Sequence, residues 1–281
     1  MTCLLSFDIE DWFHAHNLRP AVSRTEWERC EARVVENTRR ILALLEKHDT
    51  TATFFVLGWV AERHPHLVEE IAEDGHEIAS HGHNHQLLYE QSREDVQADL
   101  RRSVDILRSI VNTPVTGYRA PSFSITDEAV EVLGDLGFQY DSSSFAFSAH
   151  DRYGHLDAAD AESSGTFVTL ANGLLEARLP QVDIPVVGSA IPWAGGGYFR
   201  FIPYSIYRRG VQRVAETQPF IFYLHPWDLD PDQPRYASLP WSYRLRHYTN
   251  LDKTASRLDQ LLEDFEWEPI REGLPQTTEN S

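Results

Sequence analysis

The chain has 281 residues, and its hydrophobic content of 42% suffices for the core of one large α/β domain or two small ones. No stretch approaches the roughly 20 consecutive apolar residues that a membrane-spanning helix needs. The formal net charge of −18 argues against nucleic acid and anionic membrane surfaces as partners, since both require basic patches.

The positive charge comes almost entirely from arginine, because lysine occurs only at Lys47 and Lys253. An acidic surface with little lysine predicts a host with high internal salt, where carboxylates keep the protein hydrated and salt screens their repulsion. Residues 1–8 contain neither a positive region nor a cleavable apolar segment. We therefore expect a cytoplasmic protein, with the inner membrane surface as an alternative location.

Short apolar runs of strand character alternate along the chain with longer stretches of helical periodicity. Ser92 and Thr126 stand where N-caps are expected, and Gly75 and Gly137 stand where helices end. In the first half of the chain, the predicted elements are a strand at 4–7, a helix within 30–48, a strand at 51–57, a helix at 65–74, a strand ending near 79, a helix at 93–111, a strand at 116–119, a helix at 126–136 and a strand at 138–140. An irregular region at 145–180 follows. The remaining predicted elements are a strand at 182–187, a helix at 204–217, a strand at 220–224 and a helix at 251–266.

This alternation predicts a parallel sheet with right-handed crossovers. The number of strand–helix units indicates a closed or nearly closed (β/α) barrel. Neither a low-complexity linker nor an internal repeat interrupts the chain. We predict one domain over residues 1–272, followed by a polar tail at 273–281.

Three imidazoles stand within five positions, at His81, His83 and His85. Neutral histidine is a common metal ligand, and one helical turn would place His81 and His85 on the same face. We expect these two to bind a metal ion and His83 to lie behind them or in solvent.

Titratable residues follow other strand-like runs as well, and such ends converge at one mouth of a barrel. Asp8, Glu10 and Asp11 follow the first run, and the remaining ends carry Arg119, Asp141 and His225. Two histidines and a carboxylate are the usual ligands of a hydrolytic metal site. A second carboxylate can then deprotonate water, and a separate histidine can protonate a leaving group. This set suits hydrolysis of an amide or an ester.

The order of these motifs resembles the polysaccharide deacetylase family (NodB homology, carbohydrate esterase family 4). The resemblance covers about residues 3–228 and rests on an acidic segment, H-x-x-x-H, R-x-P, an aspartate and Leu-His in the family's order. The segments at 7–13, 195–204 and 225–231 further resemble deacetylases of exopolysaccharide and glycan biosynthesis loci. The resemblance implies a distorted (β/α) barrel of seven or eight strands.

The resemblance also implies roles for individual residues. Asp8 matches the catalytic base, and Arg119 matches the arginine that pairs with it. His225 matches the general acid, and Asp141 matches the carboxylate that tunes this histidine. His81 and His85 match the metal-binding histidines.

The chain departs from the family pattern at several positions. Asp8-Ile9-Glu10-Asp11 replaces two adjacent aspartates, so the third metal ligand is Glu10 or Asp11, and strand alternation slightly favours Glu10. Ser122 replaces a tyrosine that usually follows R-x-P. The usual tryptophan after the fourth motif is absent, so Trp12, Trp193 or Trp227 is expected to supply an aromatic wall. Further candidate substrate contacts are His14, Pro121 and Tyr198.

The leading hypothesis is a hydrolase that uses a divalent metal to remove the N-acetyl group from a sugar in a glycan or glycan precursor. Zinc is the expected ion, with Co, Ni or Mn as alternatives. A cyclic-amide hydrolase related to allantoinase and a non-catalytic glycan-binding barrel are the alternative functions. The sequence leaves the oligomeric state open.

Overall fold

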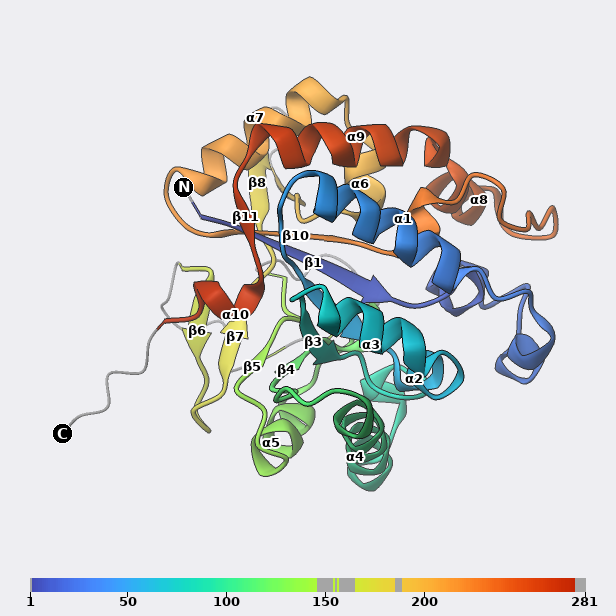
Figure 1. Cartoon of the computed structure of the whole chain (residues 1–281), viewed down its shortest axis with the longest axis vertical. Helices are drawn as coiled ribbons and strands as arrows, with labels where there is room; N and C mark the ends of the chain where they lie inside the picture. Colours follow the sequence, from blue (N-terminus) through green and yellow to red (C-terminus); the bar gives the residue numbers. More distant parts are fainter. Residues whose placement is uncertain (1, 146–153, 155, 157–164, 185–188, 276–281) are drawn as a thin grey trace.

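The structure is a computed structural model, and it describes residues 2–145, 154, 156, 165–184 and 189–275. Strands and helices alternate through most of this length, and Figure 1 shows the helices arranged in an arc around the strands. The strands are β1 (Cys3–Ile9), β2 (Thr53–Val56), β3 (Glu77–Ser80), β4 (Gly117–Tyr118), β5 (Tyr140–Asp141), β6 (Phe167–Thr169), β7 (Leu175–Ala177), β8 (Gln181–Ile184), β9 (Ser189–Pro192), β10 (Phe220–Leu224) and β11 (Trp267–Glu268).

The α-helices are α1 (Val34–Lys47), α2 (Gly58–Arg63), α3 (Pro65–Glu73), α4 (Arg93–Ile110), α5 (Asp127–Asp135), α6 (Gly196–Phe201), α7 (Tyr204–Ala215), α8 (Trp241–Tyr248), α9 (Leu251–Asp264) and α10 (Ile270–Gly273). Short 3-10 helices are η1 (Trp12–His14), η2 (His16–Leu18), η3 (Arg24–Arg29), η4 (Leu88–Glu90), η5 (Pro121–Phe123) and η7 (Pro226–Leu229).

One sheet organises the fold, with strand order β10-β1-β2-β3-β4-β5-β7-β6 and β11 beside the start of β1. Every neighbouring pair is parallel except the β6–β7 hairpin. Strands β10 and β6 stand at the two ends of this order, so the sheet is an open barrel. The predicted α/β class and the distorted barrel are confirmed.

The sheet is curled, because side chains from distant strands meet on its inner face. Tyr140 of β5 contacts Phe55 of β2, with ring centroids 6.4 Å apart. Ile221 and Tyr223 of β10 belong to the same buried cluster. Strands from both halves of the order therefore surround one interior.

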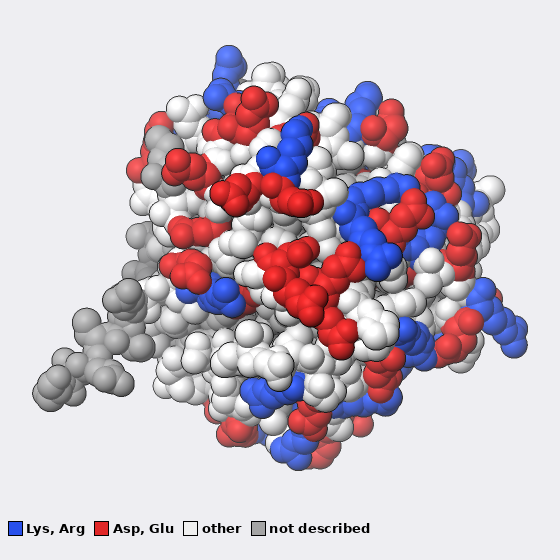
Figure 2. All heavy atoms as spheres, in the orientation of Figure 1, with Lys and Arg blue, Asp and Glu red and all other residues white. Residues whose placement is uncertain are grey.

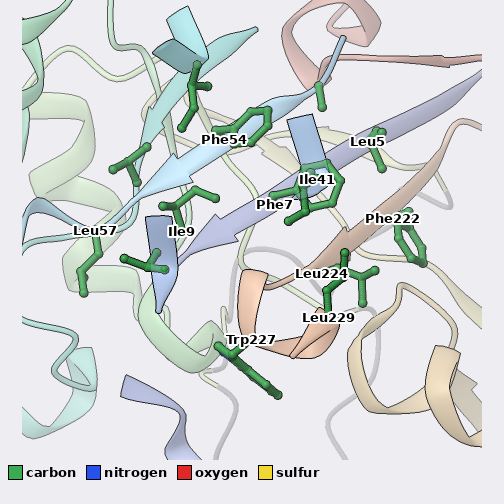
Figure 3. Packing of buried hydrophobic residues seen from close by; sticks show 14 of the residues in the cluster. Leu5, Phe7, Ile9, Ile41, Phe54, Leu57, Phe222, Leu224, Trp227 and Leu229 are labelled. Atoms are coloured by element: carbon green, nitrogen blue, oxygen red, sulfur yellow. The ribbon is translucent and has the colours of Figure 1, made fainter. Parts of the chain in front are cut away.

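The outer face of the sheet packs against the helices. Along β1, side chains alternate between the two faces, and Leu5, Phe7 and Ile9 point outward into the main core. Figure 3 shows these residues with Phe54 of β2 and Ile41 of α1, and the Phe7 and Phe54 rings lie 5.3 Å apart. The opposite alternation sends Ser6 and Asp8 to the inner face.

The predicted helices and their caps agree with the structure for the longer elements. The Ser92 side chain accepts a hydrogen bond from Asp95 N, and the Thr126 side chain accepts one from Ala129 N. Four short helices in the described part of the chain, α2, α6, α8 and α10, were not expected. The predicted strand at 182–187 is β8 over Gln181–Ile184, which pairs with β9 outside the main sheet, and positions 185–188 lie outside the described residues.

The single domain expected over residues 1–272 stays a prediction, although the sheet contains strands from Cys3 to Glu268. Of the tail at 273–281, positions 276–281 lie outside the described residues. The surface carries the acidic excess, and Figure 2 shows acidic side chains gathered on the face where α1, α3 and α9 lie.

Candidate active site

The carboxyl ends of the parallel strands converge on one pocket of about 280 Å³. Asp8 belongs to β1, and His81, Arg119 and His225 directly follow β3, β4 and β10. The pocket is lined by Asp8, Glu10, Ala15, His16, Asn17, His81, His85, Ser122, Phe123, Gly196, Gly197, Tyr198, Arg200, Phe201, Tyr223, His225, Trp227 and Arg246.

Glu10, His81 and His85 form a compact group in which one ligand atom from each lies within 4.8 Å of the others. Glu10 Oε2 is buried without a hydrogen bond from any described residue, and it lies 2.5 Å from His85 Nε2. His81 Nδ1 lies 2.8 Å from the carbonyl oxygen of Arg119. A proton on Nδ1 would donate to that carbonyl and leave Nε2 as an acceptor toward the pocket.

Electrostatics favours the ligand forms of His81 and Glu10. Burial lowers the pKa of His81 to about 4, so its imidazole is neutral near pH 7. Burial alone would raise the pKa of Glu10, but the charges of His85 and His225 hold it well below its usual range. A neutral imidazole and an ionised carboxylate are what a divalent cation requires.

The segment after β3 reaches this geometry without the predicted helical turn. Gly82 and His85 both adopt left-handed backbone conformations, with φ of 72° and 50°. The chain therefore loops back, which brings the His81 and His85 rings to 5.5 Å. The backbone N–H of His83 donates to Asp99 and its Nε2 lies 3.2 Å from Glu62, outside the pocket lining.

Asp11 is placed to cap the backbone rather than to bind a metal. Its Oδ1 accepts from the N–H of Trp12, and its Oδ2 accepts from the N–H groups of Arg33 and Val34. Three backbone donors thus occupy this carboxylate at the start of η1 and α1. Of the two predicted candidates for the third ligand, the structure places Glu10 beside His81 and His85, and Asp11 is occupied by these backbone donors.

Asp8 and Arg119 form a fully buried ion pair, with 2.8 Å between Arg119 Nη1 and Asp8 Oδ1. The other guanidinium donors bind Ser6 Oγ and the carbonyl and hydroxyl oxygens of Ser142. Asp8 is therefore fixed through one oxygen, and its Oδ2 lies 3.8 Å from His225 Nε2. This second oxygen is positioned to accept a proton.

His225 is oriented by Asp228, three residues along the same turn. Its Nδ1 lies 2.8 Å from Asp228 Oδ2, and its Nε2 lies 3.7 Å from Glu10 Oε1. Burial disfavours the charged imidazole, but the hydrogen bond to Asp228 and the nearby carboxylates outweigh it and raise the pKa of His225 to about 9. The ring is therefore protonated near pH 7, as a general acid must be.

The structure corrects the role expected for Asp141. Its nearest titratable partner is Glu176, which faces it across the β5–β7 pair, and Ser143 Oγ donates to its Oδ1 at 2.5 Å. Burial and the Asp141 charge raise the pKa of Glu176 well above its usual range. Asp141 belongs to this inner carboxyl pair, and the carboxylate that contacts His225 is Asp228.

Trp227 links the two halves of the site. Its indole N–H donates to Glu10 Oε1 at 2.9 Å, which leaves Oε2 toward His85. The same ring stacks on His225 at 4.6 Å between centroids and on His247 at 4.7 Å. Trp227 therefore contacts both the Glu10 carboxylate and the His225 imidazole.

Two of the five residues predicted to touch substrate, Tyr198 and Trp227, line the pocket. The other three do not. Trp12 is buried and donates its indole N–H to the carbonyl of Glu31. His14 accepts the backbone N–H of Asp11 on Nδ1 and stacks beneath His85 at 6.1 Å. Pro121 begins η5, of which Ser122 and Phe123 line the pocket and Pro121 does not.

A wall that the sequence did not reveal is built by α6 and α8. Arg200 binds the carbonyl oxygens of Arg246, His247 and Thr249 and forms a 2.8 Å ion pair with Asp228. Gly195 begins this wall at φ 139°, and a Cβ there would lie 2.0 Å from the carbonyl oxygen of Tyr223. The glycine run at 195–197 is therefore packed at the start of α6. The sequence signal for Asp228 was its spacing from His225 in a Pro-containing turn.

Two family descriptions match the chain. Residues 27–140 match "Polysaccharide deacetylase", and residues 142–274 match "Domain of unknown function (DUF3473)". The first match includes His81, His85 and Arg119, whereas the second includes His225, Trp227 and Arg246. The two matches meet at β5, within the one sheet.

Curated relatives match one part of the chain. A peptidoglycan-N-acetylglucosamine deacetylase of Bacillus cereus is 30% identical over 102 residues, 36% of this chain and 47% of that protein. A peptidoglycan deacetylase of Helicobacter pylori is 30% identical over 104 residues, 37% of this chain and 36% of that protein. The chain thus matches less than half the length of these two relatives.

Solved structures share the fold over nearly the whole chain. A protein from Mycobacterium smegmatis assigned to the polysaccharide deacetylases superimposes with a TM-score of 0.61 at 18% identity, covering 96% of this chain and 88% of that one. A carbohydrate esterase family 4 pseudoenzyme from Bacillus anthracis gives a TM-score of 0.52 at 16% identity, covering 98% and 65%. At such identities the likeness concerns the fold.

Proposed function

The chain belongs to the polysaccharide deacetylase family, and we propose that it hydrolyses the N-acetyl group of a sugar in a glycan or glycan precursor. The observation that carries this proposal is the joint presence, around one pocket, of the Glu10–His81–His85 group, the Asp8–Arg119 pair and His225, whose Nε2 lies 3.8 Å from Asp8 Oδ2. The curated relatives are deacetylases of peptidoglycan, which supports an N-acetylated glycan as the substrate class.

Glu10, His81 and His85 fit a divalent metal. The buried Glu10 Oε2 lacks a hydrogen-bond donor among the described residues, and two imidazoles with one carboxylate are a known catalytic zinc set. We assign zinc as the expected ion, with Co, Ni or Mn as alternatives. When bound, such an ion would polarise the acetyl carbonyl and lower the pKa of a bound water.

Two residues of the chain, Asp8 and His225, each carry out one of the proton transfers. Asp8, fixed by Arg119, accepts a proton from the attacking water through its free oxygen. His225 donates a proton to the departing amine from Nε2. Ser122 lines the pocket in a left-handed conformation at φ 53°, and we assign its backbone N–H as the donor to the developing oxyanion.

The region matched as a domain of unknown function supplies half of this site. His225, Asp228 and Trp227 all lie within residues 142–274, as do the α6 and α8 walls. Its role in this chain, we infer, is to complete the pocket with the general acid and with surfaces for the sugar.

Acetate release from N-acetylglucosamine oligosaccharides tests the proposal. The purified protein is assayed after removal of bound metal and after reloading with zinc, cobalt, nickel or manganese. Metal-dependent acetate release supports the proposal. Full metal occupancy without acetate from any N-acetylhexosamine oligomer contradicts it, and hydrolysis of allantoin instead would favour the cyclic-amide alternative. Glycan binding without turnover would favour a non-catalytic barrel.

Replacing Trp227 by phenylalanine should weaken zinc binding about 10–100-fold, since partners that orient a metal ligand contribute on this scale. Phenylalanine keeps an aromatic ring against His225 but cannot donate to Glu10 Oε1. Competition with a zinc chelator measures the affinity directly.

Trp193→Phe is the matched control for this experiment. Trp193 is a buried indole that donates to the carbonyl of Tyr207, away from the pocket lining. Equal zinc affinities of the Trp193→Phe and Trp227→Phe variants would show that the indole donor does not act on the metal group.

We also propose that the protein works in the cytoplasm or at the inner membrane surface, and that its host has high internal salt. The excess of 43 acidic residues over 25 basic ones and the two lysines support the salt adaptation. None of the helices in the described part of the chain has the length and apolar character that crossing a bilayer requires. A rise in the thermal midpoint from dilute buffer to molar KCl tests the salt adaptation, and a fall contradicts it.

A further inference from the structure

One cation in the pocket is free for a substrate. Arg246 of α8 lines the pocket, and its Cγ lies 3.9 Å from where Gly197 would carry a Cβ. Within the described part of the chain, no carboxylate or hydrogen-bond acceptor pairs with its guanidinium. Arg200 lines the same pocket, but its guanidinium already pairs with Asp228 and donates to three backbone carbonyl oxygens.

Two segments of the sequence, one of which contains Arg246, lack the acidic side chains that dominate the rest of the chain. Residues 198–215 and 233–251 contain no aspartate or glutamate, although the whole chain has a net charge of −18. Seven arginines stand in these segments, at positions 200, 208, 209, 213, 235, 244 and 246. Some of this charge is neutralised, as Arg208 pairs with Asp264 at 2.9 Å. At the pocket, α6 and α8 present Arg200 and Arg246, and neither helix contains a carboxylate that would repel an approaching anion.

The same wall offers contacts for a sugar ring. Phe201 lines the pocket with 41% of its surface exposed, and Tyr198 lies one helical turn before it. Aromatic faces pack against the apolar faces of sugars, and an arginine beside them binds carboxylate or phosphate through two parallel donors.

We propose that the substrate carries an anionic group, a carboxylate or a phosphate, near its N-acetylated sugar, and that Arg246 binds this group. The inference rests on the proposed deacetylase function and specifies its substrate class. A neutral N-acetylglucosamine polymer would leave Arg246 without a partner. An anionic glycan would be held with its acidic group at α8 and its acetamide toward Asp8 and His225.

The test compares three substrates of equal length: a neutral N-acetylglucosamine oligomer, one in which uronic acids alternate with the N-acetylated sugars, and one with a phosphate ester next to the acetamide-bearing sugar. For the wild type, kcat/KM should be higher on one or both anionic oligomers than on the neutral one. Arg246→Gln should reduce that preference about 10–100-fold, mainly through KM, since a hydrogen bond to a charged group contributes on this scale. The oligomer on which the loss is larger identifies carboxylate or phosphate as the preferred anion.

Arg244→Gln is the matched control, because it removes the same charge from the same helix outside the pocket lining. It should leave the ratio of anionic to neutral turnover unchanged. An equal loss in the two variants, or no preference in the wild type, overturns the inference.

Binding separates this inference from the proposed function. If the wild type releases no acetate from any of the three oligomers, the deacetylase function fails. Titration calorimetry then still decides about Arg246: tighter binding of the anionic oligomers, lost in Arg246→Gln, supports it. Equal binding of all three oligomers overturns it.

Discussion

Replacing Asp8 by asparagine should lower kcat about 10²–10⁴-fold, the usual loss for a general base, while metal content stays at the wild-type level. Asparagine keeps the shape of the side chain and can accept from Arg119 Nη1 through its carbonyl oxygen. Its amide nitrogen cannot take a proton from water at the position now held by Asp8 Oδ2, 3.8 Å from His225 Nε2. Initial rates of acetate release and metal analysis of the same sample measure both quantities.

Asp11→Asn is the companion variant, because it tests the neighbouring carboxylate in its structural role. Asp11 accepts three backbone N–H groups, so loss of its charge should lower the thermal midpoint and leave kcat and metal content near the wild type. Loss of metal from Asp11→Asn with an unchanged midpoint would return Asp11 to the ligand set. A normal kcat for Asp8→Asn would remove Asp8 as the base.

The convergence of the site was predictable from the sequence for a simple physical reason. Parallel strands that feed helices end at the same edge of a sheet, so polar residues that follow several strands must gather there. Asp8, His81, Arg119 and His225 meet this condition. The structure places Asp8, His81 and His225 in the lining of one pocket and Arg119 in contact with Asp8. Period-two alternation along β1 also favoured Glu10 over Asp11.

Contacts within that edge were harder to predict, because they depend on how the turns after each strand fold. Asp141 follows a strand as the others do, but its side chain faces Glu176 on β7, a strand inside the region predicted to be irregular. Asp228 reaches His225 because Pro226 starts a 3-10 turn that places residues i and i+3 together. The β5–β7 pairing therefore places Asp141 beside Glu176, whereas the 3-10 turn places Asp228 beside His225. The sequence did not reveal the strand pairing.

The α6–α8 wall escaped prediction because tertiary contacts stabilise it more than local propensity does. Helix α6 has six residues and starts with glycines, which are poor helix formers. Arg200 fixes α6 to α8 through three carbonyl groups. The residues in these contacts are more than 40 positions apart in the sequence, so no local sequence pattern predicts them.

Replacing His225 by glutamine should also lower kcat about 10²–10⁴-fold, because the departing amine then lacks its proton donor. Asp228→Asn should produce a different effect, since it acts through His225. Against the effect of burial, the hydrogen bond and charge of Asp228 together with the charges of Glu10 and Asp8 raise the pKa of His225 to about 9. The neutral amide removes the charge of Asp228, so the pKa of His225 should fall toward its ordinary value of about 6.5.

The sign of the pH effect follows from which form is active. The protonated imidazole is the acid, so kcat/KM declines as pH rises through the pKa of His225. Asp228→Asn should therefore shift the alkaline limb of the kcat/KM profile to lower pH and leave metal content unchanged. Asp232→Asn, a nearby carboxylate outside the pocket lining, should keep the wild-type profile. A lower kcat/KM for Asp228→Asn with an unmoved alkaline limb would mean that Asp228 only supports the Arg200 wall, since that role changes the position of α6 without changing the proton affinity of His225.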